Sequence, residues 1–318
     1  MFTRPLLELA APLATIGLLI AGCSSSVGTG DDSPSAPGGG KEASEPAVVE
    51  SDATEVHLIG DWLPNPGPFY EGTRYGQVTG PITQRFLEDD LTIANLECPV
   101  TDEAPLRDGV DFAVRCRSDD LDQMVAAGVD AAVLTNDHIT DFGPAGIEDT
   151  LRALAEADIV AVGPGVDPVT LETVNGPVDI LAIPRSGPFR VSDAEAVTMI
   201  GDAARNGIPL IVGVHWGRDG ARAADPADNE LAERLVAAGA DVIMGHGAGV
   251  LHAFRRVDDA AVFMGLGRFV WPVLDDLEAD TAVASVSLVD ETATRPCLLA
   301  ATISPSGDPA FDHRDPSC

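Results

Sequence analysis

Basic residues are scarce in this chain of 318 residues. Lysine and arginine together number 19, against 51 aspartates and glutamates, and the net charge at pH 7 is −32. Lysine occurs once, at Lys41. Because binding to nucleic acid requires a basic face that neutralises phosphates, this charge balance argues against nucleic acid as a partner.

Cysteine pairs with the close spacing of zinc-binding motifs are lacking, so a metal cluster held by thiolates is not expected. Of the five cysteines, Cys23 belongs to the N-terminal segment described next. The other four are an even number, which in an exported protein suggests two disulfides. Proximity in the sequence favours Cys98 with Cys116 and Cys297 with Cys318, although all three pairings and free buried thiols remain alternatives.

The N-terminus also lacks a hydrophobic run of about 20 residues, the length that spans a membrane comfortably. Residues 5–21 are mostly apolar but contain Glu8, and Arg4 precedes them. A basic residue, a short apolar stretch and small residues, in that order, are typical of a secretory signal peptide. The run Leu-Ile-Ala-Gly-Cys that ends at Cys23 resembles a bacterial lipobox, in which the cysteine is lipidated and becomes the new N-terminus. An ordinary signal peptide with a coincidental cysteine is the alternative.

We therefore expect four parts in the chain. Residues 1–22 are predicted as the lipoprotein signal peptide. Residues 23–53, rich in Ser, Gly, Pro and acidic residues, are predicted as the lipidated cysteine and a disordered, flexible tether. Residues 54–304 contain no second linker and no repeat and are predicted as one domain, followed by a C-terminal tail over 305–318. Acyl chains on Cys23 would hold the protein on the extracytoplasmic face of the cell membrane.

Apolar runs that indicate buried strands alternate with amphipathic stretches that indicate helices. This alternation predicts an α/β fold with a largely parallel sheet. The last three predicted strands follow one another without helices, which predicts an antiparallel portion at that end. The predicted strands are 56–59, 91–95, 131–134, 159–162, 178–183, 210–214, 242–244, 261–264, 282–288 and 298–303. The predicted helices are 81–87, 120–127, 144–157, 193–206 and 226–238.

Polar side chains follow five of the predicted strands, at the point where each strand ends. In α/β proteins the carboxyl ends of the strands form the binding edge of the sheet. Oxygen and nitrogen donors without sulfur suit a divalent cation, which could polarise a substrate oxygen or lower the pKa of bound water. Each signal alone is weak, because a lone Gly-Asp pair is typical of a turn and a lone histidine is typical of a hydrogen-bonded residue in the protein core. Taken together, in chain order, the residues are Asp61, Asn95, Glu97, Asn136, Asp137, His138, His215 and His246.

The order of these motifs resembles that of a known family. Over about residues 56–271 the chain is similar to the CapA family, the group of poly-γ-glutamate capsule synthesis proteins. The resemblance implies a calcineurin-like metallophosphatase fold, an α/β layered sandwich of mixed, largely parallel sheets flanked by helices. The matching motifs are Gly60-Asp61, Asn95-Leu96-Glu97, Asn136-Asp137-His138 with Asp141-Phe142-Gly143, His215-Trp216-Gly217, Gly245-His246 and Gly265-Leu266-Gly267-Arg268-Phe269.

The resemblance also implies roles for residues in these motifs. His138 matches a histidine that, in related phosphoesterases, protonates a leaving group or steadies the transition state. The expected substrate contacts are Asn95, Asn136, Trp216 and Arg268. The expected ligands of a divalent cation (Mn, Mg or Zn) are Asp61, Glu97, Asp137, His215 and His246.

Several positions depart from the family pattern. Gly247 and Gly249 stand where the family has histidines, so a site with one ion, or with none, is expected rather than a complete two-metal site. Arg268 replaces an asparagine, and its guanidinium could clamp a carboxylate or a phosphate. Asp137 also replaces an asparagine and can still bind a cation. His252 is a candidate replacement for a missing imidazole.

Two functional hypotheses follow from these observations. The first is a metal-dependent hydrolase or transferase of the cell envelope that acts on poly-γ-glutamate or a similar anionic polymer, alongside the capsule synthesis machinery. The second is a surface protein without turnover that binds such a polymer or a partner in that machinery. A bound metal would relieve the repulsion between an anionic polymer and a chain of this charge.

Overall fold

The computed structural model describes residues 53–64, 76–165, 167–271 and 279–312. The predicted signal peptide, Cys23 and all but the last residue of the predicted tether lie outside these ranges, so the predictions about them stay predictions. Across the ranges that are described, no helix is both long enough and apolar enough to cross a membrane.

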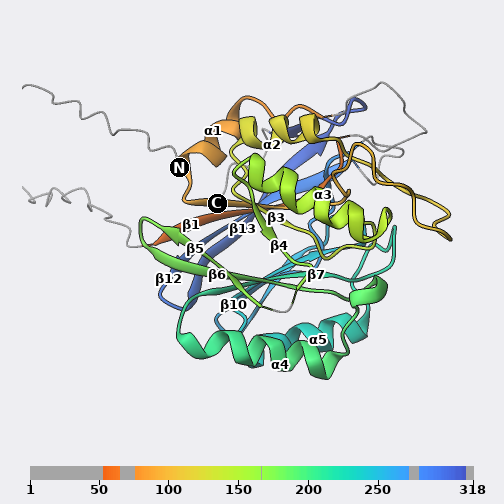
Figure 1. The fold of residues 1–318 in the computed structure, drawn as a ribbon. Coiled ribbons are helices and arrows are strands. Elements are labelled where there is room, and N and C mark those ends of the chain that lie inside the picture. The colour runs from red at the N-terminus through yellow and green to blue at the C-terminus, as the bar shows by residue number, and fades with distance from the viewer. Residues whose placement is uncertain (1–52, 65–75, 166, 272–278, 313–318) are drawn as a thin grey trace, which may run out of the picture. The chain divides into compact units, whose positions relative to one another are not determined.

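Eight strands of the described chain form a first, mixed sheet (Figure 1). They are β1 (Thr54–Trp62), β2 (Leu91–Leu96), β3 (Ala131–Val133), β4 (Val160–Val162), β11 (Arg268–Val270), β12 (Asp280–Val289), β13 (Thr292–Ile303) and β14 (Pro309–Phe311). Strands β1 to β4 are parallel neighbours in that order, and β11 pairs in parallel with the end of β1. Strands β12, β13 and β14 extend the sheet on the other side of β1 in antiparallel fashion. The predicted antiparallel portion near the C-terminus is therefore present.

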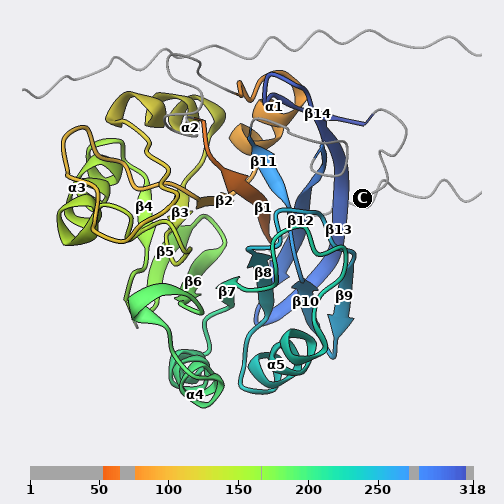
Figure 2. The ribbon, with the colours of Figure 1, turned by 90° about the vertical axis from the view of Figure 1, so that its right-hand side faces the viewer.

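Six further strands of the described chain form a second sheet (Figure 2). They are β5 (Val169–Thr173), β6 (Gly176–Ile183), β7 (Leu210–His215), β8 (Val242–His246), β9 (Phe254–Val257) and β10 (Ala260–Phe263). Strands β6, β7, β8 and β10 are parallel, and antiparallel strands β5 and β9 close the two edges. Both sheets therefore have a parallel centre and an antiparallel margin.

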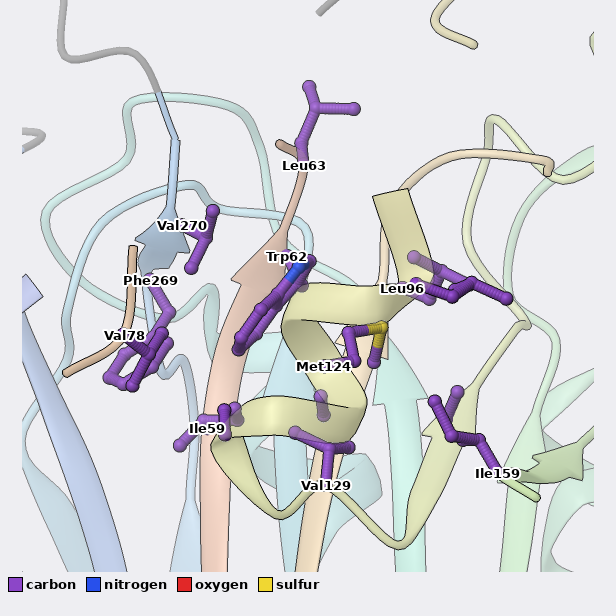
Figure 3. Close-up of a cluster of buried hydrophobic side chains, with 14 of the residues drawn as sticks. Ile59, Trp62, Leu63, Val78, Leu96, Met124, Val129, Ile159, Phe269 and Val270 are labelled. Carbon is purple, nitrogen blue, oxygen red and sulfur yellow. The ribbon is translucent and has the colours of Figure 1, made fainter. Parts of the chain in front are cut away.

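Helices cover the outer face of each sheet (Figure 1). The first sheet carries α1 (Pro81–Glu88), α2 (Leu121–Ala127) and α3 (Gly143–Glu156), and the second carries α4 (Asp193–Ala203) and α5 (Pro226–Ala237). Trp62, Met124 and Phe269 belong to the core between the first sheet and its helices (Figure 3). The order of layers, helix–sheet–sheet–helix, is the predicted layered α/β sandwich with mixed sheets.

A third core lies between the two sheets and sets the direction of the side chains at their ends. Ile93 of β2, Ile211 of β7 and Met244 of β8 meet there. Because side chains alternate between the two faces of a strand, residues two or four positions further along point into the same gap. His215, four residues after Ile211, and His246, two residues after Met244, therefore face the first sheet.

Local sequence signals account for where the helices begin and end. A proline occupies the first turn of α1, α3 and α5. Backbone N–H groups in the first turn have no partner within the helix, so the N–H that proline lacks costs no helical hydrogen bond. At the start of α4, Ser192 and Glu195 form a reciprocal capping box. Gly128 ends α2 in the left-handed conformation that glycine adopts without strain.

Four short strands, β5, β9, β11 and β14, were not anticipated from the sequence. Strand β5 alternates half-buried with exposed residues, β9 contains Arg255 and Arg256, and β11 and β14 are only three residues long. Strand β14 lies in the segment predicted as a tail and adds to the edge of the first sheet. Edge pairing depends on the neighbouring strand, which the sequence of the short strand does not reveal.

Candidate metal centre

Strand β1 delivers Asp61 to the edge of the gap through a tight backbone contact. A bulge between Ile59 and Asp61 shifts the register with β2. Gly60 lies at this bulge, where a Cβ atom would stand 2.0 Å from the carbonyl oxygen of Gly267. The Asp61 N–H donates to the same oxygen at 2.9 Å. Only glycine allows the two backbones to come this close, so the Gly60-Asp61 motif is a positioning device for the carboxylate.

Two buried amides hold the carboxylates that follow β1 and β2. The Asn95 Nδ2 donates to Asp61 Oδ1 at 2.8 Å and also to Glu97 Oε2. The Asn136 Nδ2 in turn donates to the Asn95 side-chain oxygen at 3.3 Å and to the Leu96 carbonyl oxygen at 2.7 Å. These contacts make Asn95 and Asn136 supports that fix Asp61 and Glu97, and the substrate contacts predicted for both stay predictions.

Side chains from both sheets meet in one group of metal-type donors. Ligand atoms of Glu97, Asp137 and His215 all lie within 4.8 Å of one another. The His215 Nε2 is 3.4 Å from Asp137 Oδ1, and its Nδ1 is 4.0 Å from Glu97 Oε2. Glu97 is buried, whereas the side chain of Asp137 is 57% exposed and opens the group to solvent. No other such group of three or more donors occurs in the portion of the chain that is described.

A second histidine, His246, stands beside Asp61. Its Nδ1 lies 3.3 Å from Asp61 Oδ1, and both side chains are buried. Neither ring nitrogen of His246 has a hydrogen-bond partner among the described residues, and the same holds for Nδ1 of His215. Buried polar atoms are nearly always paired, and leaving one unpaired costs about 1–3 kcal/mol.

These residues fit a divalent cation. The donor set combines carboxylate oxygens with imidazole nitrogens and contains no sulfur, which is the chemistry that such ions prefer. A cation would use the lone pairs of the unpaired imidazole nitrogens and offset the charge of the clustered carboxylates. Each of the five predicted ligands lies at this edge: three in the Glu97, Asp137 and His215 group, and two in the Asp61 and His246 pair.

The pKa shifts in the centre reflect this crowding. Burial, and then the charges of Asp61 and Asp137, raise the pKa of Glu97 well above its ordinary value. Burial alone would raise the pKa of Asp137 too, but the hydrogen bond and charge of His215 outweigh it and lower that pKa. Burial lowers the pKa of His246, which favours the neutral ring that can bind a metal.

His138 lies next to the donor group and is oriented by Asp141. The His138 Nδ1 is 2.9 Å from Asp141 Oδ2, and its Nε2 is 3.9 Å from Asp137 Oδ1. Burial would lower the pKa of His138, but the bond to Asp141 and the nearby carboxylates raise it. The raised pKa favours the protonated form of a ring whose Nε2 faces Asp137. The sequence motif that contains Asp141 did not by itself predict this role. Its spacing of three residues from His138 is the feature of the sequence that could have indicated it.

A disulfide closes the loop that supports this histidine. Cys98 and Cys116 are bonded, as proximity in the sequence predicts. Within the loop, the Val114 N–H donates to Asp141 Oδ2 at 3.1 Å and the Arg107 N–H donates to the Asp141 carbonyl oxygen at 2.8 Å. The loop therefore holds Asp141, and through it His138, in place.

The second predicted disulfide is only half described. Cys297 is disulfide-bonded, and Cys318, its predicted partner, lies outside the described residues. That pairing stays a prediction.

Three other expectations need correction or restatement. Trp216 is buried in the core between the second sheet and its helices and donates to the Met264 carbonyl oxygen at 2.8 Å, so it has little surface for the predicted substrate contact. His252 bonds the Ala221 carbonyl oxygen at 2.7 Å and joins no donor group of the described chain, so it does not replace a missing imidazole. Arg268 lies at the centre's edge, 93% buried, and is treated below.

Comparisons with known proteins find relatives whose names refer to capsule, PGA or polyglutamine synthesis. The chain is 29% identical over 187 residues to the capsule biosynthesis protein CapA of Bacillus anthracis, covering 52% of this chain and 45% of that protein. It is 30% identical over 219 residues to a Mycobacterium tuberculosis protein named "Probable polyglutamine synthesis accessory protein", covering 59% and 56%. It is 27% identical over 208 residues to the PGA biosynthesis protein CapA of Bacillus subtilis, covering 58% and 54%.

The chain spans about half the length of these curated relatives. A protein family described as "Bacterial capsule synthesis protein PGA_cap" matches residues 55–182 and 185–272, which include every residue of the centre. The resemblance to the CapA group drawn from the sequence motifs is thereby confirmed. This chain belongs to the bacterial capsule synthesis protein family PGA_cap.

Proposed function

We propose that this chain is a cell-envelope protein that handles an anionic capsule polymer, poly-γ-glutamate or one like it, through a divalent-metal centre. The single observation that carries the proposal is the convergence of Glu97, Asp137 and His215 from two different sheets. The names of the relatives from Bacillus, which refer to capsule and PGA biosynthesis, support the choice of polymer. A bound cation would also offset the repulsion between such a polymer and a chain with a net charge of −32.

The residues of the centre have different proposed roles. Glu97, Asp137 and His215 would hold the ion, which supplies a Lewis acid for a substrate oxygen and lowers the pKa of a bound water. Asn95 keeps the Glu97 and Asp61 carboxylates in place. His138 holds a proton on the ring that Asp141 orients, ready to protonate an oxygen that leaves the substrate.

The proposed location is the extracytoplasmic face of the cell membrane. The lipobox-like run ending at Cys23 supports a lipid anchor, with residues 24–53 as the tether. The proposed partners are the membrane, the polymer and the capsule synthesis machinery. The test is metabolic labelling with a lipid precursor: wild type should be labelled and Cys23→Ser should not, while Cys98→Ser serves as a control cysteine.

A second candidate function is binding without turnover, and the loop after β8 favours it. Gly247 and Gly249 offer no side-chain donors, and both adopt positive φ angles, 100° and 66°. A centre with few ligands could bind an anionic polymer without cleaving it. This candidate shares the ion and the polymer with the first and differs only in catalysis.

Metal analysis followed by a turnover assay tests the proposal and separates the two candidates. Metal-stripped protein would be loaded with Mn²⁺, Mg²⁺ or Zn²⁺, and bound metal measured for wild type, Asp137→Ala and the exposed loop control Asp111→Ala. Binding by wild type and the control, with loss in Asp137→Ala, supports the centre, and no binding by wild type would reject it. Hydrolysis of γ-glutamyl polymer or phosphoesters that disappears in His138→Ala would then select the enzyme over the binding protein.

A further inference from the structure

The two halves of the centre are unequally equipped with donors. One half brings three side chains together, Glu97, Asp137 and His215. The other half has the Asp61 and His246 pair, and its next neighbour, the Asn95 amide, already donates to Asp61. A divalent cation bound by protein alone usually takes three or more side-chain ligands. The first half meets that number and the second does not.

The loop after β8 has no room for a further ligand at Gly247. A Cβ atom there would lie 2.5 Å from the Trp216 carbonyl oxygen and 3.1 Å from the His215 Nε2. The positive φ of this residue also disfavours any other side chain. Gly247 therefore shapes the loop around His215 and excludes a donor from this position.

The space beside Gly249 is bordered by Asp219 and by Arg268. A Cβ atom at Gly249 would lie 3.4 Å from the Arg268 Nε and 3.1 Å from the Asp219 Oδ1. The guanidinium of Arg268 stacks on the Trp271 ring, 4.4 Å from its centroid, and its Nη2 is 3.8 Å from Asp219 Oδ1. Asp219 and Arg268 thus lie against Gly249, and a Cβ atom there would touch the guanidinium and require the Asp219 carboxylate to shift by a few tenths of an ångström.

Arg268 also lies beside the half of the centre that is poor in donors. It is the partner of Asp61 in the parallel pairing of β11 with β1, so neighbouring strand positions carry the two side chains. Its side chain is 9% exposed, and a guanidinium remains protonated even when it is buried. The strand position next to Asp61 therefore carries a side chain with a permanent positive charge.

We propose that this centre holds one divalent cation, on Glu97, Asp137 and His215, and that Arg268 supplies beside Asp61 the positive charge that a second cation would otherwise supply. The inference rests on the proposed function for the existence of a metal centre. It adds the number of ions and a fixed cationic group, which together suit a ligand with paired anionic oxygens, such as a carboxylate or a phosphoryl group.

The first test is the number of ions bound by the full-length wild-type chain, which requires no variant. Metal-stripped protein is titrated with Mn²⁺ by calorimetry, and bound metal is counted by mass spectrometry after gel filtration. We expect one Mn²⁺ per chain. Two ions per chain would overturn this inference and leave the proposed function intact, whereas no ion would reject both.

The second test asks whether Arg268 acts through its charge. In Arg268→Gln the loss of a nearby positive charge should tighten Mn²⁺ binding by about three- to tenfold at low salt and weaken binding of inorganic phosphate to the Mn²⁺-loaded protein. Arg268→Lys, which keeps the charge, should stay close to wild type in Mn²⁺ affinity. The control Arg205→Gln removes an exposed charge from the segment between α4 and β7 and should change neither.

The variants distinguish a charge effect from a packing effect. If Arg268→Gln and Arg268→Lys weaken Mn²⁺ binding equally, Arg268 is only a packing residue and the inference fails. Unchanged Mn²⁺ and phosphate affinities in Arg268→Gln would overturn it as well. Should Arg268→Gln not fold, the stoichiometry of wild type and the response of Arg268→Lys still decide the matter.

Discussion

The described part of the chain contains two pairs of a buried histidine and a buried aspartate, and the two pairs are built differently. His57, near the start of β1, bonds Asp89 through Nδ1, and the Thr92 hydroxyl donates to the same carboxylate at 2.7 Å. His246, at the end of β8, stands 3.3 Å from Asp61 and makes no hydrogen bond with the described residues through either nitrogen.

From this difference we assign the first pair to the structure of the protein and propose the second as part of the candidate centre. The His57 pair is tied into the protein's own hydrogen bonds through His57 Nδ1 and Asp89 Oδ2, while His57 Nε2 and Asp89 Oδ1 have no partner among the described residues. The His246 pair leaves lone pairs free at the edge where the two sheets present their strand ends. Burying polar atoms without partners destabilises a fold, so a site of this kind is typical of residues kept for a ligand.

The largest expected effect is on metal binding. His215→Ala removes a direct donor and should weaken Mn²⁺ binding by about 100-fold or more, because loss of even a supporting partner costs 10–100-fold. His57→Ala should leave Mn²⁺ affinity unchanged. Calorimetric titration of both variants measures the effect, and equal Mn²⁺ affinities of the two variants would show that His215 is not a ligand.

The next effect concerns the disulfide that closes the loop beside Glu97. Replacing Cys98 and Cys116 together by serine should lower the free energy of unfolding by about 3 kcal/mol, the amount expected for a loop of this size. Without the disulfide, the loop should also hold Asp141 and His138 less firmly in place. Urea unfolding measures the first change, and a drop in the His138 pKa followed by NMR measures the second. Unchanged stability and an unchanged pKa would show that the loop does not support the site.

A smaller effect should separate the two histidine–aspartate pairs in metal-free protein. His57→Ala and His246→Ala both leave a cavity beside a buried carboxylate, but only the first breaks a hydrogen bond among the described residues. We expect His57→Ala to lower the free energy of unfolding by about 1–3 kcal/mol more than His246→Ala. Urea unfolding in the presence of a chelator provides the values. A larger loss in His246→Ala would contradict the assignment of His57 as the structural member.

The smallest effect is the pH dependence of a carboxyl group away from the centre. Burial raises the pKa of Asp241, just before β8, to about 6, against the hydrogen bond that it accepts from the Leu210 N–H. The folded state therefore binds this proton more tightly than the unfolded state, so its contribution to stability is full below about pH 4 and is lost as pH rises towards 6.

Asp241→Asn tests this contribution. The amide retains an oxygen that can accept from Leu210 and does not titrate. The variant should lose part of the fall in thermal stability between pH 4 and pH 6 that wild type shows. A fall as steep in the variant as in wild type would assign it to other groups.

Much of the fold could be predicted because its central strands are continuous apolar runs. Each of the ten predicted strands coincides with a strand of the structure, and the five predicted helices appear at their expected places. The edge strands escaped prediction because their pairing is decided by neighbours. The layered arrangement of facing sheets was expected from the family resemblance alone, since periodicity within a strand does not say which sheet the strand joins.

The candidate site was predictable in composition and less so in arrangement. Residues at the ends of parallel strands must gather at one edge, so the sequence predicted the set of donors. It did not show that Asn95 and Asn136 would support carboxylates, or that Trp216 would turn into a core, because these depend on packing between layers. The approach of Arg268 to Gly249 is likewise a contact between distant segments.

The most direct test of the metal centre is anomalous diffraction from crystals of the wild-type protein soaked in Mn²⁺. The account predicts one anomalous peak between the two sheets, within about 2.0–2.6 Å of donor atoms of Glu97, Asp137 and His215, the range for divalent cations. The absence of a peak at these three side chains, with Mn²⁺ bound elsewhere or nowhere, would contradict it.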